Sequence, residues 1–190
     1  RKFYRNVMFL NPKISQHKPF KDNTRNIVWK YDEHQFKAWC EGRTGFPLID
    51  AAMRQLKQEG WMHNRLRMVV AMFFSKNMFH DWRLGEKFFM ENLIDGDFSS
   101  NNGGWQWSAS TGTDAAPYFR IFNPISQSEK FDKDGKFIKK YVPELKDLDA
   151  KEIHLPSPGL LFPKEYFKPM LDLKESRVLA IEAFKSNKDN

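Results

Sequence analysis

The chain has 190 residues and carries 31 lysines and arginines against 24 aspartates and glutamates, a net charge of +7. This length suits one domain with a sizeable core, and the basic balance fits either a polyanionic partner or ordinary surface charge. Cys40 is the only cysteine, which excludes a disulfide framework and predicts a reducing, cytoplasmic setting. No apolar run approaches the roughly 18 residues of a membrane span, so no membrane association is expected.

The first 60 residues predict three helices, over 3–10, 34–40 and 46–59. A polar connecting loop is expected over 11–32, with Trp29 within it. Thr44 is a good N-cap for the third helix, and Gly60 is suited to end that helix in the left-handed conformation.

The strongest helical pattern spans 62–78, where apolar side chains nearly encircle the axis and indicate deep burial. Its first turn is polar, and Asn64, Arg67 and Met68 share one face because they are three and four residues apart. A buried helix that begins this way needs a partner for its polar groups; an exposed, salt-bridged terminus is the alternative. Cationic side chains at a helix N-terminus oppose the macrodipole, which favours the functional interpretation slightly.

A further helix over 84–93 follows Trp82, and two carboxylates, Asp95 and Asp97, then flank Gly96. The next stretch, 101–124, fits neither a helix nor a strand, because two asparagines and two glycines at its start favour turns. It also contains Trp105 and Trp107. A loop this long and aromatic is costly unless it lines a site, although a buried structural loop is the alternative.

The C-terminal third predicts helices over 125–131, 137–141 and 173–185, separated by a proline-containing ordered coil over 143–169. The Asp132-Lys-Asp-Gly turn resembles the start of a calcium loop, but Pro143 stands where that loop needs a glutamate. No histidine spacing indicates a metal site, and no glycine-rich phosphate loop is present. The predicted class is all-α, a compact multi-helix bundle with long ordered loops that forms one domain over 1–190.

Polar residues flank long apolar helices at five positions: Asn64, Arg67, Asp95, Asp97 and Asn101. Tryptophans are spread along the chain at 29, 82 and 105, each of which taken alone is more often a core residue. Together the two sets predict a cofactor with a polar edge and an aromatic body.

Three motifs resemble the FAD-binding helical domain of the DNA photolyase/cryptochrome family: EGRTGFPLID at 41–50, WMHNRLRM at 61–68 and LIDGD at 93–97. The resemblance runs from Arg1 to about Leu145 and is looser beyond residue 150. It implies that this chain is the C-terminal part of that domain, a piece of a longer protein. An N-terminal antenna domain with a second chromophore, and the helices that hold the FAD phosphates, would lie outside it. We therefore expect the isolated piece to be inactive and to bind FAD weakly or not at all.

The same resemblance implies roles for individual residues. The flavin would be surrounded by Asn64, Arg67, Asp95, Gly96, Asp97 and Asn101. Electrons would pass from the surface through Trp29, Trp82 and Trp105. DNA would contact Arg1, Asn64, Arg65, Met68, Trp107 and Gln127, with Lys130 as a further candidate for a phosphate contact. Trp61 is expected near the adenine of FAD.

The implied activity is light-driven repair of cyclobutane pyrimidine dimers by a monomeric deoxyribodipyrimidine photo-lyase. Met68, Trp107 and Asn101 resemble the residues of dimer photolyases, which favours repair over signalling. A cryptochrome-like photoreceptor and a flavin-free module that binds damaged DNA are the alternatives. Asn77 departs from the aspartate of many relatives, so we expect Arg67 to lose a charge partner.

Overall fold

The computed structural model describes residues 2–156 and 166–187, and within these ranges the regular structure is helical. The only extended pairing there is an isolated parallel bridge between Lys30 and His80. The all-α prediction is therefore confirmed. Arg1, and the part of the predicted coil that covers 157–165, lie outside the described residues.

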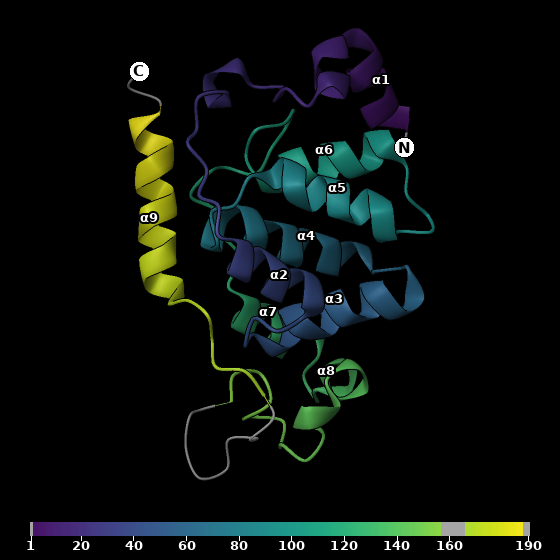
Figure 1. Ribbon diagram of the computed structural model, residues 1–190, viewed down its shortest axis with the longest axis vertical. Helices are drawn as coiled ribbons and strands as arrows, with labels where there is room; N and C mark the ends of the chain where they lie inside the picture. Colours follow the sequence, from purple (N-terminus) through teal and green to yellow (C-terminus); the bar gives the residue numbers. More distant parts are fainter. Residues whose placement is uncertain (1, 157–165, 188–190) are drawn as a thin grey trace.

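The α-helices are α1 (Lys2–Leu10), α2 (Glu33–Glu41), α3 (Pro47–Glu59), α4 (Asn64–Met72), α5 (Trp82–Asn92), α6 (Phe98–Ser108), α7 (Pro124–Phe131), α8 (Lys136–Tyr141) and α9 (Leu173–Ser186). Short 3₁₀ turns cover η1 (Pro12–Gln16), η2 (Asp22–Thr24) and η4 (Pro143–Leu145), and a π-helical turn, η3 (Phe73–Asn77), continues α4. Helices α2 to α6 stack in the middle of the molecule (Figure 1). Helix α1 lies at one end, α8 lies at the other, and α9 runs along one side.

The main core lies among α2 to α6 and includes three fully or almost fully buried tryptophans, Trp39, Trp82 and Trp105. Trp105 packs edge-on against Phe89 of α5, with ring centres 5.1 Å apart. Gly85 permits this approach of α5 and α6, since a Cβ at that position would overlap the Trp105 ring. The apolar core therefore fixes the spacing of the helices that carry the predicted site residues.

Helix α6 contradicts the prediction that residues 101–124 begin as a loop. Asn102, Trp105 and Gln106 of this helix and its C-cap residue Ala109 are buried, and they follow the i, i+3, i+4, i+7 spacing of a helix face. Two of these four positions are polar, so the buried face of the helix does not appear as a repeat of apolar residues in the sequence. Asp97 caps the helix, and tertiary packing overrides the weak helix propensity of its glycines and asparagines.

The predicted helix over 62–78 is also divided differently. It begins at Asn64, where the His63 ring nitrogen accepts a hydrogen bond from the Arg65 amide, and it changes to π-helical geometry at Phe73. The π-turn holds the fully buried Lys76, whose ammonium donates to the carbonyls of Pro117 and Arg120 at 3.2 and 3.0 Å.

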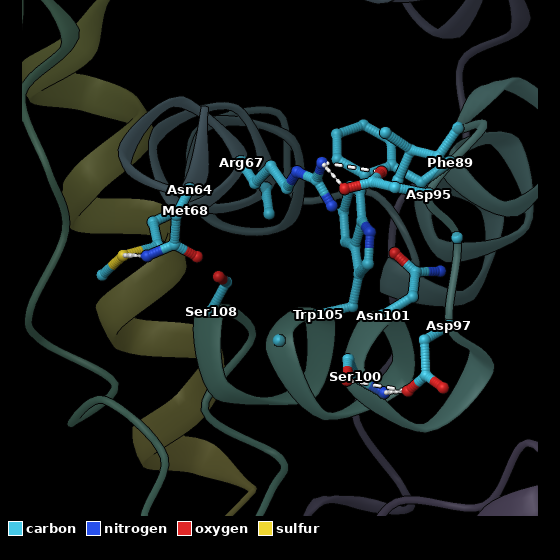
Figure 2. A pocket seen from close by; sticks show the side chains of 14 residues that line it. Asn64, Arg67, Met68, Phe89, Asp95, Asp97, Ser100, Asn101, Trp105 and Ser108 are labelled. Carbon is cyan, nitrogen blue, oxygen red and sulfur yellow. Dashed lines mark hydrogen bonds and ion pairs between the residues drawn. The ribbon is translucent and has the colours of Figure 1, made fainter. Parts of the chain in front are cut away.

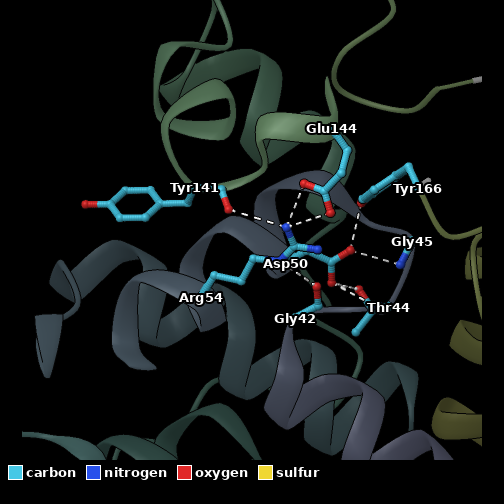
Figure 3. Close-up of polar contacts among 8 residues, drawn as sticks. All are labelled: Gly42, Thr44, Gly45, Asp50, Arg54, Tyr141, Glu144 and Tyr166. Carbon is cyan, nitrogen blue, oxygen red and sulfur yellow. Dashed lines mark hydrogen bonds and ion pairs between the residues drawn. The ribbon is translucent and has the colours of Figure 1, made fainter. Parts of the chain in front are cut away.

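A buried polar cluster joins the start of α3 to the C-terminal segment (Figure 3). Thr44, which was expected to cap α3, instead donates from its amide and hydroxyl to Asp50 at 2.7 and 2.6 Å, and Tyr166 donates to the same carboxylate at 2.7 Å. The cap position is Phe46, with no side-chain bond. Burial raises the pKa of Asp50, and these hydrogen bonds oppose the rise. Arg54 pairs with Glu144 at 2.8 Å beside this cluster.

We expect Gly85→Ala to lower the free energy of unfolding by about 1–3 kcal/mol, because the added methyl group forces Trp105 away from α5. Gly104→Ala is the matched control on α6: a Cβ there meets no atom within 4 Å, so the helix should gain up to about 1 kcal/mol. Urea denaturation of both variants provides the measurement. A Gly85→Ala protein as stable as the unmodified chain would contradict the packing described.

Candidate functional site

A cavity of about 230 Å³ lies where α4 and α5 meet α6 and the link before it (Figure 2). All six predicted flavin contacts line it: Asn64, Arg67, Asp95, Gly96, Asp97 and Asn101. Met68 and Trp105 line it as well. Six further residues line the cavity that the sequence did not predict: Ala71, Phe89, Leu93, Ser100, Gly104 and Ser108. The helical periodicity of α6 would have indicated Gly104 and Ser108, which lie three or four residues from Asn101 and Trp105.

One wall of the cavity carries the ion pair between Arg67 and Asp95. The Arg67 guanidinium donates to both carboxylate oxygens at 2.9 and 3.0 Å, and its Nε donates to the Met62 carbonyl at 2.7 Å. Both side chains are roughly one-third exposed. Two contacts to the carboxylate and one to the backbone fix the guanidinium plane, so a cation of defined orientation faces the cavity.

Asp97 forms the opposite rim and holds the first turn of α6. It accepts hydrogen bonds from Arg5 at 2.7 Å, from the Ser99 hydroxyl at 2.7 Å, and from the amide and hydroxyl of Ser100 at 3.0 and 2.8 Å. These donors, with Arg5 contributing most, hold the pKa of Asp97 well below its usual range. The carboxylate is therefore engaged within the protein and stays charged.

Asn101 is oriented by Glu86 of α5. Its amide nitrogen donates to the Glu86 carbonyl at 2.9 Å and lies 3.4 Å from the Glu86 carboxylate. Burial raises the pKa of Glu86, and the contact with Asn101 partly opposes that rise. Because the amide nitrogen is engaged, the carboxamide oxygen of Asn101 is left as the group that can accept a hydrogen bond at the cavity.

Two buried polar atoms at the cavity have no hydrogen-bond partner within the described residues: Ser108 Oγ and Trp105 Nε1. Such atoms are costly unless a bound molecule or water satisfies them. The floor of the cavity is apolar, formed by Ala71, Phe89 and Leu93, while its rim is charged. A planar ring system with polar edge atoms fits this arrangement, although about 230 Å³ is below the roughly 300–1,000 Å³ of a typical ligand pocket.

The three predicted electron carriers share one core. Trp82 and Trp105 belong to it, and the half-buried Trp29 packs against it. Among the described rings, none of these three tryptophans contacts another directly. Trp105 instead contacts Trp39 of α2, with ring centres 6.0 Å apart. Sequence analysis missed Trp39 because a tryptophan in a short helix gives no signal beyond ordinary burial.

The predicted DNA contacts are distributed over three helices. Asn64 and Met68 lie at the cavity, and Trp107 lies half-buried on α6 but outside the cavity lining. The Arg65 guanidinium lies 4.9 Å from the ring centre of Phe131 on α7, the helix that also carries Gln127. Arg1 lies outside the described residues, so the structure places only five of these six residues.

Asn77 does not face Arg67, which corrects the expectation of a lost charge partner. Its amide nitrogen donates to the Ser176 hydroxyl of α9 at 3.1 Å, and Arg67 is neutralised by Asp95 instead.

Trp61 is 42% exposed and contacts the His63 ring. The Lys130 ammonium lies 5.4 Å from the ring centre of Phe131. Across the described part of the chain, no helix combines the length and apolar character needed to cross a bilayer.

The family described as the FAD binding domain of DNA photolyase matches residues 1–186. A deoxyribodipyrimidine photo-lyase of Salmonella typhimurium is 50% identical over 191 residues, which cover 98% of this chain and 40% of the relative. Among solved structures, a class III photolyase from Agrobacterium tumefaciens superposes with a TM-score of 0.95 at 43% identity, covering 100% of this chain and 41% of that one. An archaeal photolyase from Sulfolobus tokodaii, solved with two FAD molecules, superposes with a TM-score of 0.89 at 42% identity. This match covers 98% of this chain and 42% of that one. The chain thus spans about 40% of the length of the Salmonella relative.

Asp97 should make folding depend on pH in a defined window. The pKa of Asp97 is lower in the folded state than in the unfolded state, where it is about 4. Its charge therefore stabilises the fold at a pH above the unfolded-state pKa, and this stabilisation is lost as the pH falls toward the folded-state pKa. Asp97→Asn keeps a capping side chain but removes the charge. We expect the stability difference between the two proteins to be constant from neutral pH to about 5 and to shrink below about 4. Asp147→Asn, at an exposed position, is the control, and a difference that does not change in acid would contradict the assignment.

Proposed function

Because the chain belongs to the family of FAD-binding domains of DNA photolyases, we propose that its α4–α6 cavity holds the flavin of FAD for light-driven repair of cyclobutane pyrimidine dimers. The observation that carries this proposal is the convergence of six expected flavin contacts on one cavity. FAD, when bound, supplies the light absorption and the electron that the repair reaction requires. Residues 1–190 would form the C-terminal part of the enzyme's FAD-binding helical domain.

Within the cavity, Arg67 would stabilise negative charge on the ring edge, and Asp95 would hold the guanidinium plane in place. The carboxamide oxygen of Asn101 would accept a hydrogen bond from a proton-bearing ring nitrogen, because the Asn101 amide nitrogen is already held by the Glu86 carbonyl. Ser108 offers a hydroxyl that lacks a partner within the described residues. The polar rim would orient the ring, and the apolar floor would keep water from it.

We further propose that Trp105, Trp82 and Trp29 pass electrons from the surface toward the cavity. Trp105 lines the cavity, Trp82 is fully buried in α5, and Trp29 is half-buried. Trp29 is the only one of these three that is not fully or almost fully buried, which supports its place as the surface end of the chain. Their shared apolar core supports the proposed transfer as well, because an indole inside a core is held rigidly and away from water.

On the DNA side, Asn64 and Met68 would border the flipped-out dimer at the cavity mouth, with Trp107 and Gln127 as further contacts. The Phe131 ring limits the freedom of Arg65, which suits a fixed phosphate contact. Binding should therefore weaken as salt rises. A cryptochrome-like photoreceptor would share the flavin cavity but not the repair. A flavin-free module would share the DNA contacts alone. An antenna chromophore elsewhere in the protein stays a prediction.

The flavin assignment predicts that Arg67→Gln weakens FAD binding about tenfold, because one charge-assisted hydrogen bond is lost. The loss should be larger for reduced than for oxidised FAD, since the reduced ring carries negative charge. Both affinities are measured in the longer protein of which we expect this chain to be a piece: quenching of flavin fluorescence gives the affinity for oxidised FAD, and anaerobic titration gives that for reduced FAD. Arg83→Gln is the matched control: Arg83 forms a similar pair with Asp81 at 3.0 Å and similar exposure, but lies outside the cavity. Equal effects of the two variants would refute the assignment.

The repair assignment predicts that Trp107→Ala weakens binding of dimer-containing DNA by about 1–3 kcal/mol, with FAD affinity unchanged. Trp107→Phe should restore most of the affinity, because a phenyl ring can still stack. Filter binding measures affinity, and dimer loss under blue light measures repair, both in the longer FAD-loaded protein of which we expect this chain to be a piece. Flavin binding without any light-dependent repair would favour the photoreceptor, and DNA binding without flavin would favour the flavin-free module.

A further inference from the structure

A second cavity of about 220 Å³ lies on the other side of the core, where η2 and the loop after α6 meet α9. Its walls combine aromatic rings, amides and one cation: Tyr118, Phe119, Phe184, Asn23, Asn187 and Lys21 are among the residues that line it. Its size is close to that of the proposed flavin cavity. None of the proposed flavin or DNA contacts lines it.

The charge around this cavity is positive. Lys21 is half-buried, and its ammonium forms no ion pair within the described residues. Burial lowers the pKa of the nearby Lys76 to about 7, and the charges of Arg120 and Lys21 lie close enough to lower it further. Among the described residues that line the cavity, Lys21 is the one charged side chain and none is a carboxylate. A lining with a cation and no acid favours an anionic ligand.

The aromatic wall is held in place by bonds from side chains to the backbone. Lys76 donates to the carbonyls of Pro117 and Arg120, on either side of Tyr118 and Phe119. The Ser110 hydroxyl donates to the Ala116 carbonyl at 2.5 Å. Ser110 itself has a backbone φ of 64°, which is uncommon for a residue other than glycine. Tyr118 also stacks on Phe184 of α9, with ring centres 5.9 Å apart and planes 22° apart. The loop is thus fixed before any ligand binds, which lowers the entropic cost of binding.

We propose that this cavity binds a small aromatic anion of the nucleoside monophosphate class. The 54%-exposed Phe119 offers a face on which a base can stack. The carboxamide of Asn23 and the carboxamide oxygen of Asn187, whose amide nitrogen donates to the Asn23 carbonyl, can hydrogen-bond the edge of the base. Lys21 supplies the point charge for the phosphate. Trp29 contacts Phe184 at 6.1 Å, so the ligand would lie one aromatic ring away from Trp29.

Isothermal titration calorimetry of the chain with AMP, adenosine and inorganic phosphate tests this site. We expect AMP to bind with a Kd of about 1 mM or below. Adenosine, which lacks the charge, and phosphate, which lacks the ring, should each bind at least about tenfold more weakly. No AMP binding at concentrations well above about 1 mM would overturn the proposal, and so would equal binding of AMP and adenosine.

Lys21→Gln should weaken AMP binding about tenfold and leave adenosine binding unchanged. Lys18→Gln, at an exposed lysine outside the cavity, should change neither and controls for surface charge. Phe119→Ser should weaken AMP and adenosine together without affecting the fold, because its ring is exposed. AMP binding that survives Lys21→Gln but is lost in Arg67→Gln would place the nucleotide in the flavin cavity instead, and would overturn the proposed second site.

Discussion

The close contact between Gly85 of α5 and the Trp105 ring is the constraint on which the rest of the site depends. It sets the distance between α5 and α6, and these two helices with α4 form the cavity. The same approach brings Asn101 within hydrogen-bond distance of Glu86. If the helices moved apart, the floor and the polar rim of the cavity would separate together, because both are carried on the same helices.

Residues with strong local signals were predicted correctly from the sequence. Gly60 ends α3 with a φ of 64°, and the apolar spacing of α3 and α9 gives their bounds to within a residue or two. The polar face of Asn64, Arg67 and Met68 does line a cavity, because i, i+3 and i+4 spacing places residues together wherever a helix forms. Their position beside apolar helices also grouped Asp95, Asp97 and Asn101 with these residues, and the family resemblance then assigned the whole set to a flavin.

Features that depend on tertiary partners could not be predicted. Helix α6 forms despite weak propensity because its mixed stripe packs on the core. Thr44 satisfies Asp50 rather than capping α3, since that carboxylate is buried and needs donors from the chain segments around it. The partner of Asn77 is a serine 99 positions away in the chain. Contacts of this range leave no local pattern.

The π-turn at Phe73–Asn77 ends the helix that α4 begins, and its geometry corresponds to one extra residue in that last stretch. An inserted residue advances everything after it by about 100° around the axis. Deleting one residue from this turn would restore the α-helical phase and rotate position 77 away from Ser176, while the residues before it kept their places. Helix α4 thus contributes to the cavity, whereas the π-turn that ends it directs Asn77 toward α9 and Lys76 toward the loop at 117–120. The extra residue lets one helix serve two different sides of the core.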